Sequence, residues 1–285
     1  MPIDLAMAKG ATTPESKGSW GPDDVILYHL GIGAGLEKPT DPKELEYTYE
    51  QKLKALPSFG VIPVFESFMR GMGGLPGVSI NLALVLHGEQ DIEIHKPIPT
   101  RAEVVSQGRV ADIFDKGKAA LLILEVETRE KGGDKLFTNR FSIFARGEGG
   151  FGGDPGPKPT NQAPERKPDR VVESRTTPNQ ALLYRLCGDK NPLHADPDFA
   201  KLGGFDTPIL HGLCSYGIVC KAVVDSMLDG VVGRVARYQA RFSGVFYPGE
   251  TMVTSMWKED GKILIASKSK ERDAAIIANS AITLR

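Results

Sequence analysis

Apolar and polar positions divide the chain into two stretches that share one order of predicted elements. Each stretch opens with a short amphipathic helical segment, ILYHL at 26–30 and LLYRL at 182–186, and the two segments lie 156 positions apart. Strand-like runs follow, rich in β-branched and aromatic residues, and they bend at Pro99 in the first stretch and at Pro248 in the second. Because short turns join these runs, we expect antiparallel sheets. The predicted strands fall within 81–105, 118–130 and 135–146, and within 233–260, 262–272 and 274–285.

A longer helix candidate stands between the opening helix and the strands in each stretch. In the second stretch it is HGLCSYGIVCKAVVDSML, residues 211–228, which is apolar nearly all round. A helix of this kind is buried, so we expect a sheet wrapped around it, in an α+β layer arrangement. Two copies imply a duplicated domain that packs on itself. The glycine-rich GIGAG at 31–35 follows a helix and not a strand, so we interpret it as a helix exit and not as a dinucleotide loop.

A glycine- and proline-rich segment separates the two stretches. Residues 146–170 read RGEGGFGGDPGPKPTNQAPERKPDR, almost without large apolar side chains. Such a segment cannot bury a core, and we interpret it as a linker. The predicted organisation is therefore an N-terminal repeat at 1–145, the linker at 146–170 and a C-terminal repeat at 171–285.

Composition narrows the class of function. The formal net charge of −1 provides no long-range attraction to nucleic acid or anionic membranes. There is no run of 18 apolar residues, no secretory signal and no SKL-type terminus, so we expect a cytoplasmic protein without a membrane span. Three cysteines without a CxxC pair indicate reduced thiols and not metal ligands.

The segment CGDKNPLHAD at 187–196 carries the candidate chemistry. Gly188 can end the preceding helix, and Pro192 forbids a helix and pushes Asn191 into extended backbone. Five residues along a helix would turn through about 500° and point Asp189 and His194 apart. A loop broken by proline removes that restriction, so the two side chains can converge.

The loop is bounded by a short helix and followed by a long one. Asp196 is a suitable N-cap, Pro197 fits the first turn, and Gly203 can end this helix. His211 and Gly212 then begin the buried helix, where the first N–H groups have no partner within the helix. Because Gly212 has no side chain, a ligand oxygen could approach its N–H, as an oxyanion-type donor requires.

An acid, an amide, a base and a helix N–H within this short span indicate proton transfer beside a polarised carbonyl. The reactions open to such a site are the addition or loss of water at a double bond conjugated to a carbonyl, and the hydrolysis of a thioester.

Residues 184–200, YRLCGDKNPLHADPDFA, and 204–217, GFDTPILHGLCSYG, resemble the signature of the MaoC-like (R)-specific enoyl-CoA hydratases, or hydratase 2. The closing segment ARFSGVFYPGETMVTSMWKEDGKILIASK is similar to the same family. The first stretch, through HKPIPTRAEV and its element order, resembles the degenerate first repeat of the two-repeat, eukaryotic-type hydratases.

This resemblance implies a double hot-dog fold and the reversible syn hydration of trans-2-enoyl-CoA to (3R)-3-hydroxyacyl-CoA, in fatty acyl-CoA metabolism such as β-oxidation. It implies that Asp189 and His194 activate one water, that Asn191 orients it, and that the Gly212 N–H binds the thioester oxygen. It requires no cofactor. We also expect His211 and Arg241 to contact the substrate, with Arg237 and Lys221 as weaker candidates for the CoA phosphates.

Three other functions stay open at this stage: a hot-dog acyl-CoA thioesterase, a dehydratase acting on carrier-protein thioesters, and a non-catalytic acyl-CoA-binding module. The family tendency to pair suggests a homodimer.

Overall fold

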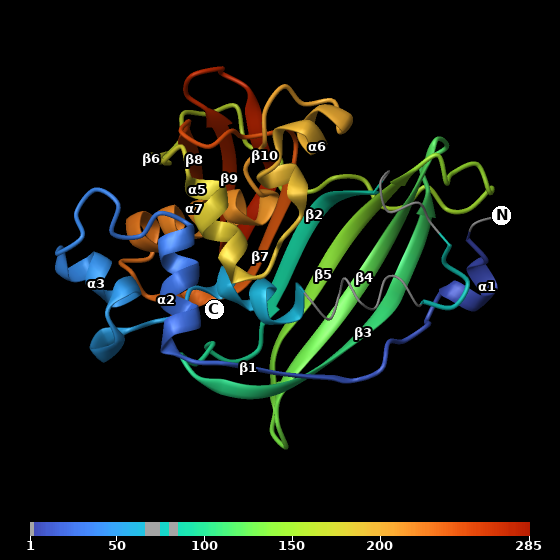
Figure 1. Ribbon diagram of the computed structural model, residues 1–285, viewed down its shortest axis with the longest axis horizontal. Helices are drawn as coiled ribbons and strands as arrows, with labels where there is room; N and C mark the ends of the chain where they lie inside the picture. Colours follow the sequence, from blue (N-terminus) through green and yellow to red (C-terminus); the bar gives the residue numbers. More distant parts are fainter. Residues whose placement is uncertain (1–2, 66–74, 80–84) are drawn as a thin grey trace.

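The computed structural model describes residues 3–65, 75–79 and 85–285. Its centre is one ten-stranded antiparallel sheet with the strand order β1-β3-β4-β5-β2-β7-β10-β9-β8-β6. The long strands of the first stretch and the shorter strands of the second lie on either side of the β2–β7 junction (Figure 1). The strands are β1 (Ser16–Trp20), β2 (Val85–Ile94), β3 (Ala102–Asp115), β4 (Ala119–Glu130), β5 (Lys135–Arg146), β6 (Arg170–Arg175), β7 (Val235–Phe242), β8 (Thr251–Glu259), β9 (Lys262–Ser269) and β10 (Ala275–Leu284).

The two halves of the sheet are arranged with pseudo-two-fold symmetry about the β2–β7 pair. Outward from the junction, the first half runs β2, β5, β4, β3, β1, and the second runs β7, β10, β9, β8, β6. When the five strands of each half are numbered 1 to 5 along the chain, both halves have the order 2, 5, 4, 3, 1 outward from the junction. Asp91 on β2 pairs with Gln239 on β7 and forms an ion pair across the junction with Arg237. The repeated order confirms the double hot-dog class, with the two sheets joined edge to edge.

One long helix, α7 (Gly212–Met227), lies in the second half with most of its residues buried. Two helices with matching sequences pack together beside it (Figure 1): α2 (Pro22–Gly31) and α5 (Gln180–Tyr184). Their tyrosines, Tyr28 and Tyr184, are both fully buried, with ring centroids 6.2 Å apart. The remaining elements are α1 (Leu5–Ala8), α3 (Pro42–Thr48) and α6 (Pro197–Leu202), with the 3₁₀ turns η1 (Glu50–Lys52), η2 (Pro57–Val61), η4 (Arg185–Cys187), η5 (Pro192–His194) and η6 (Val232–Arg234).

Strands β1 and β6 were not predicted from the sequence. They are short edge strands, SKGSW and RVVESR, without a long apolar alternation. The long helix candidate of the first stretch was predicted without bounds. Between α2 and β2 the structure has η2 and then helical residues at 62–65, and residues 66–74 lie outside the described residues.

The segment between β5 and β6 contains neither helix nor strand. It nevertheless packs against the second half of the sheet, because the indole N–H of Trp257 donates to the carbonyl of Arg166 at 2.8 Å. Asn161 in the same segment donates to Gln239 at 3.3 Å. The division into repeats at 1–145 and 171–285 with a linker at 146–170 stays a prediction; β5 ends at Arg146 and β6 begins at Arg170.

Gly217 on α7 provides a test of the packing between the halves. A Cβ at this position would lie 2.5 Å from the Tyr28 hydroxyl and 2.7 Å from Ile32 Cγ2. We expect Gly217→Ala to lower the free energy of unfolding by about 1–3 kcal/mol, the usual cost of overpacking. Gly233→Ala is the matched control, because no atom lies within 4 Å of its added methyl group. Equal unfolding midpoints for both variants in urea would contradict this packing.

Candidate active site

The loop between α5 and α6 has the broken geometry that its sequence predicts. The helix ends through η4 at Gly188, whose φ of 136° is a conformation that side chains rarely adopt. Asn191 is extended, with φ −51° and ψ 124°, and its Oδ1 accepts the Leu193 N–H, which caps η5. Asp196 then caps α6 by accepting the N–H of Asp198. The loop is therefore held by short-range hydrogen bonds at both ends.

His194 is the last residue of η5 and is 8% exposed. Its Nδ1 lies 2.8 Å from the carbonyl oxygen of Ile209. Because a carbonyl only accepts, Nδ1 carries the proton and Nε2 keeps a lone pair in the neutral ring. Burial lowers the pKa of His194 from its usual 6.5 more than the nearby Asp189 and the Ile209 carbonyl raise it. The ring is thus prepared to accept a proton at Nε2.

Asp189 lies beside this ring. Side-chain atoms of Asp189, His194 and His211 that can bind a proton or metal lie within 4.8 Å of one another. The N–H of Asn191 donates to the Asp189 carboxylate at 3.1 Å and so helps to orient it. Two groups at this separation can both hydrogen-bond to one water, since each bond spans about 2.8 Å. The structure therefore brings the predicted acid and base together.

Gly212 is the first residue of α7 and follows His211 directly. Among the described residues, no hydrogen bond from its N–H is recorded. A Cβ at Gly212 would lie 3.3 Å from the ring of Phe242, so a larger residue would crowd this helix start. An N–H at a helix start attracts a partly negative oxygen. This property agrees with the role predicted for the Gly212 N–H, that of an oxyanion-type donor.

His211 and Arg241, the two predicted substrate contacts, differ in exposure. His211 is 1% exposed, and its Nε2 lies 3.2 Å from the carbonyl oxygen of Asp189. Arg241 on β7 has 41% of its side chain exposed and a long 4.0 Å ion pair with Glu89. Lys221 is held by Glu44 and Asp225, and Arg237 by Asp91, so neither weaker candidate for the CoA phosphates has a free charge.

Arg185 was missed by the sequence interpretation, although it lies within the YRLCGD motif. It donates from Nη2 to the carbonyl of Lys190 at 2.9 Å and so bridges the loop that contains Asp189. Its positive charge also lowers the pKa of His194 and His211.

The cluster of Asp189, His194 and His211 has three side chains of the metal-binding type. One nitrogen of His211 is used on the Asp189 carbonyl, and the other, Nδ1, is buried without a hydrogen-bond partner. His194 Nδ1 and His211 Nε2 lie against backbone carbonyls, so the lone pairs that remain are those of the Asp189 carboxylate, His194 Nε2 and the buried His211 Nδ1. We interpret Asp189 and His194 as an acid/base pair.

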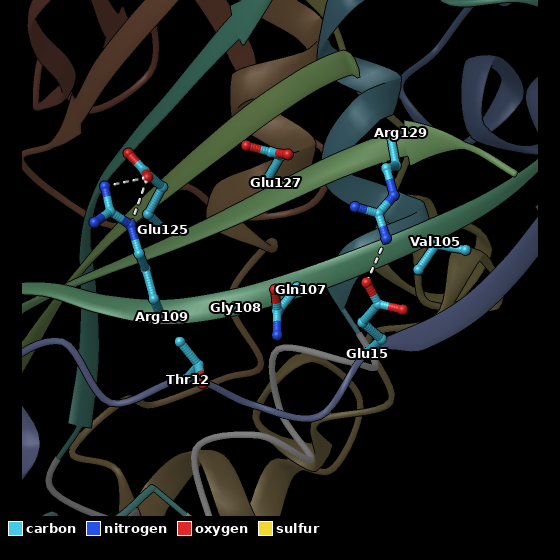
Figure 2. Close-up of a pocket in the computed structure, with 9 residues that line it drawn as sticks. All are labelled: Thr12, Glu15, Val105, Gln107, Gly108, Arg109, Glu125, Glu127 and Arg129. Carbon is cyan, nitrogen blue, oxygen red and sulfur yellow. Dashed lines mark hydrogen bonds and ion pairs between the residues drawn. The ribbon is translucent and has the colours of Figure 1, made fainter. Parts of the chain in front are cut away.

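A cavity of about 120 Å³ lies on the first half of the sheet, between β3, β4 and the segment before β1 (Figure 2). Its charged side chains are paired, Arg109 with Glu125 and Arg129 with Glu15. It is smaller than the roughly 300–1,000 Å³ of typical ligand pockets, and none of the predicted site residues lines it. We do not assign chemistry to it.

Two family models match the chain, the MFE-2 hydratase 2 N-terminal domain at residues 19–147 and the MaoC-like domain at residues 159–280. The chain belongs to the MaoC-like hydratase 2 family. It is 48% identical to Enoyl-CoA hydratase ChsH3 of Mycobacterium tuberculosis, with 97% of both chains covered. It is 41% identical to the peroxisomal Enoyl-CoA hydratase 2 of Arabidopsis thaliana, covering 93% of this chain and 90% of that one.

Solved structures of this MaoC-like family have the same architecture. The MaoC-like dehydratase from Phytophthora capsici is 32% identical and superposes with a TM-score of 0.88, covering 99% of this chain and 98% of that chain. No helix in the described parts of this hydratase family member has the length and apolar character of a membrane span.

The protonation of His194 can be measured directly. We expect its imidazole to titrate below 6.5 in the folded protein, because burial disfavours the charged ring. The unfolded chain then takes up the proton first, so stability from His194 is present above pH 6.5 and is lost as the pH falls below it. The measurement is an NMR titration of the His194 ring, assigned with His194→Gln. A midpoint at or above 6.5 would refute this.

Proposed function

We propose that this protein catalyses the reversible hydration of trans-2-enoyl-CoA to (3R)-3-hydroxyacyl-CoA, as a hydro-lyase of fatty acyl-CoA metabolism. The observation that carries the proposal is the convergence of the Asp189 carboxylate and the His194 ring within 4.8 Å, beside His211, which directly precedes the helix start at Gly212. The relatives named enoyl-CoA hydratase, at 41–48% identity over nearly the whole chain, support it.

In the proposed reaction one water lies between Asp189 and His194. The Nε2 lone pair of His194 takes one water proton while the water oxygen forms a bond to C3 of the enoyl group. The electron pair of the C2–C3 double bond moves towards C2, and negative charge builds on the thioester oxygen. The Gly212 N–H stabilises this charge. Asp189 starts in its protonated form and delivers its proton to C2, and the resulting carboxylate then takes the water proton from the His194 imidazolium. The substrate gains H and OH, both residues return to their starting states, and no cofactor is consumed.

Asn191 has a smaller role in this proposal than the sequence suggests. Its Oδ1 is already used on the Leu193 N–H, and its own N–H is used on Asp189. Only its amide NH₂ remains to orient the water. Its main contribution is therefore to fix the carboxylate of Asp189.

Thioester hydrolysis would use the same water but direct it at the thioester carbon. The names of the relatives favour hydration, and the two reactions give different products. Hydration of crotonyl-CoA removes the enoyl-thioester absorbance and releases no thiol, whereas hydrolysis releases free CoA. Chiral analysis of the 3-hydroxy product then tests the (3R) configuration. Release of thiol without loss of the conjugated double bond would contradict hydration.

The homodimer and the cytoplasmic location stay predictions from the sequence. Relatives from Arabidopsis thaliana and Mus musculus are named as peroxisomal enzymes. Sedimentation at several protein concentrations would test the dimer.

Removal of either member of the acid/base pair provides the direct test. We expect Asp189→Asn and His194→Gln each to lower kcat by about 10²–10⁴-fold, the usual contribution of a positioned acid or base. Both replacements keep a similar shape, so near-ultraviolet circular dichroism and CoA binding should be preserved. Full activity in either variant would exclude that residue from the proton transfer.

The role proposed for Arg241 concerns binding and not chemistry. We expect Arg241→Ala to raise KM about 3- to 10-fold with little change in kcat, because a partly exposed cation contributes on the order of 1 kcal/mol to phosphate binding. Arg109→Ala, in the cavity on the first half of the sheet, is the control and should leave both constants unchanged. Similar KM values for the two variants would remove Arg241 from the binding site.

A further inference from the structure

His211 contacts both Asp189 and His194 and directly precedes Gly212. Its Nε2 lies 3.2 Å from the Asp189 carbonyl, its ring stacks on that of His194 with centroids 3.7 Å apart and planes 30° apart, and its peptide leads into Gly212. A second ring, that of Tyr184, packs on it with centroids 5.0 Å apart. At 1% exposure, the side chain has almost no surface for a substrate.

We propose that His211 is a positioning residue that holds Asp189 and His194 in register and keeps the His194 ring neutral. This inference rests on the proposed hydratase function. It replaces the predicted substrate contact of His211 with an action through its neighbours.

The hydrogen bond decides the protonation of His211. The Asp189 carbonyl can only accept, so Nε2 of His211 carries the proton and Nδ1 carries the lone pair. This Nδ1 is buried without a hydrogen-bond partner. A proton there would place a charge in a dry site beside a second imidazole, and burial together with His194 lowers the pKa of His211 to about 2. His211 therefore stays in one tautomer throughout the working pH range.

The stacked ring acts on His194 in two ways. It excludes water from one face of the imidazole, which disfavours the charged form, and it limits rotation of the ring. The charged or titratable groups that affect His194 are Asp189, which favours its protonation, and Arg185, which disfavours it. A neutral His211 adds no charge to this balance, so its removal changes mainly the solvation and position of the ring.

Two variants separate the hydrogen bond from the stack. His211→Gln supplies an amide N–H for the Asp189 carbonyl but removes the aromatic face. His211→Phe keeps an aromatic face on His194 but removes the donor. We expect both to lower kcat about 10- to 100-fold with KM changed less than 3-fold, since small displacements of reacting groups have effects of this size.

The pH dependence then distinguishes positioning from a general loss of stability. In His211→Gln the acidic limb of kcat/KM should move up towards 6.5, because water reaches the His194 ring. In His211→Phe the limb should stay where it is in the wild type. A rise in KM with kcat unchanged would assign His211 to substrate binding. Unchanged kcat with a lower unfolding midpoint, or identical pH profiles in both variants, would reduce it to a packing residue, and either result overturns the proposal.

A measurement on the unaltered protein covers the case in which a variant does not fold. Long-range ¹H–¹⁵N spectra between pH 5 and 8 should show His211 as the Nε2–H tautomer and His194 as the Nδ1–H tautomer, with no titration of His211. A proton on His211 Nδ1, or titration within this range, overturns the proposal. Because the spectra need no substrate, this result stands apart from the activity assay: a protein without hydratase activity refutes the proposed function whatever the tautomers are.

Discussion

The hydrogen bond from His194 Nδ1 to the Ile209 carbonyl is the constraint on which the site depends. It selects the tautomer that leaves the lone pair on Nε2, so the neutral ring can accept a proton at one atom only. It also ties the loop of the acid/base pair to the segment that enters α7, three residues before Gly212. That segment is itself fixed, because the N–H of Leu210 donates to the carbonyl of Phe246 at 2.7 Å. The proton acceptor and the proposed oxyanion donor are therefore held by one short piece of backbone, and neither can move without the other.

The first repeat shows what the same framework does without these groups. His29, on the ILYHL helix, is fully buried and uses both ring nitrogens, Nδ1 at 2.9 Å from the Tyr47 carbonyl and Nε2 accepting the N–H of Leu56 at 3.3 Å. Leu56 directly precedes η2, so an N–H at the start of this segment is satisfied within the protein, whereas no partner within the described chain is recorded for the N–H of Gly212. Burial lowers the pKa of His29 to about 3. His29 therefore has no ring nitrogen left to accept a proton from a ligand, and its role in the first repeat is structural.

Sequence patterns predicted most of the fold and the backbone geometry of the loop at 187–196 because those features have local causes. Gly188, Pro192 and Asp196 act on their own backbone, and the alternation in the long strands reports the burial of their faces, so these elements formed where expected. The edge strands β1 and β6 were missed because their pairing, with β3 and β8, joins segments more than 75 residues apart. The roles of His211 and Arg185 depend on hydrogen bonds from their side chains to the carbonyls of Asp189 and Lys190. Residue spacing in the sequence does not predict such bonds. Similarly, Lys221 looks like a free cation in the sequence, and only the fold brings Glu44 to it.

The stack of His194 on His211 limits how the site can carry charge. Two imidazoles with centroids 3.7 Å apart can stack in a buried site when both are neutral. Burial away from solvent disfavours a positive charge on either ring. In the proposed reaction, the Ile209 carbonyl and Asp189 stabilise the His194 imidazolium, while Arg185 opposes it. The charged ring is therefore a state that the surroundings tolerate only briefly. In the proposed reaction such a base would pass its proton on to the Asp189 carboxylate instead of holding it, as a reaction that adds both parts of one water molecule to a double bond requires.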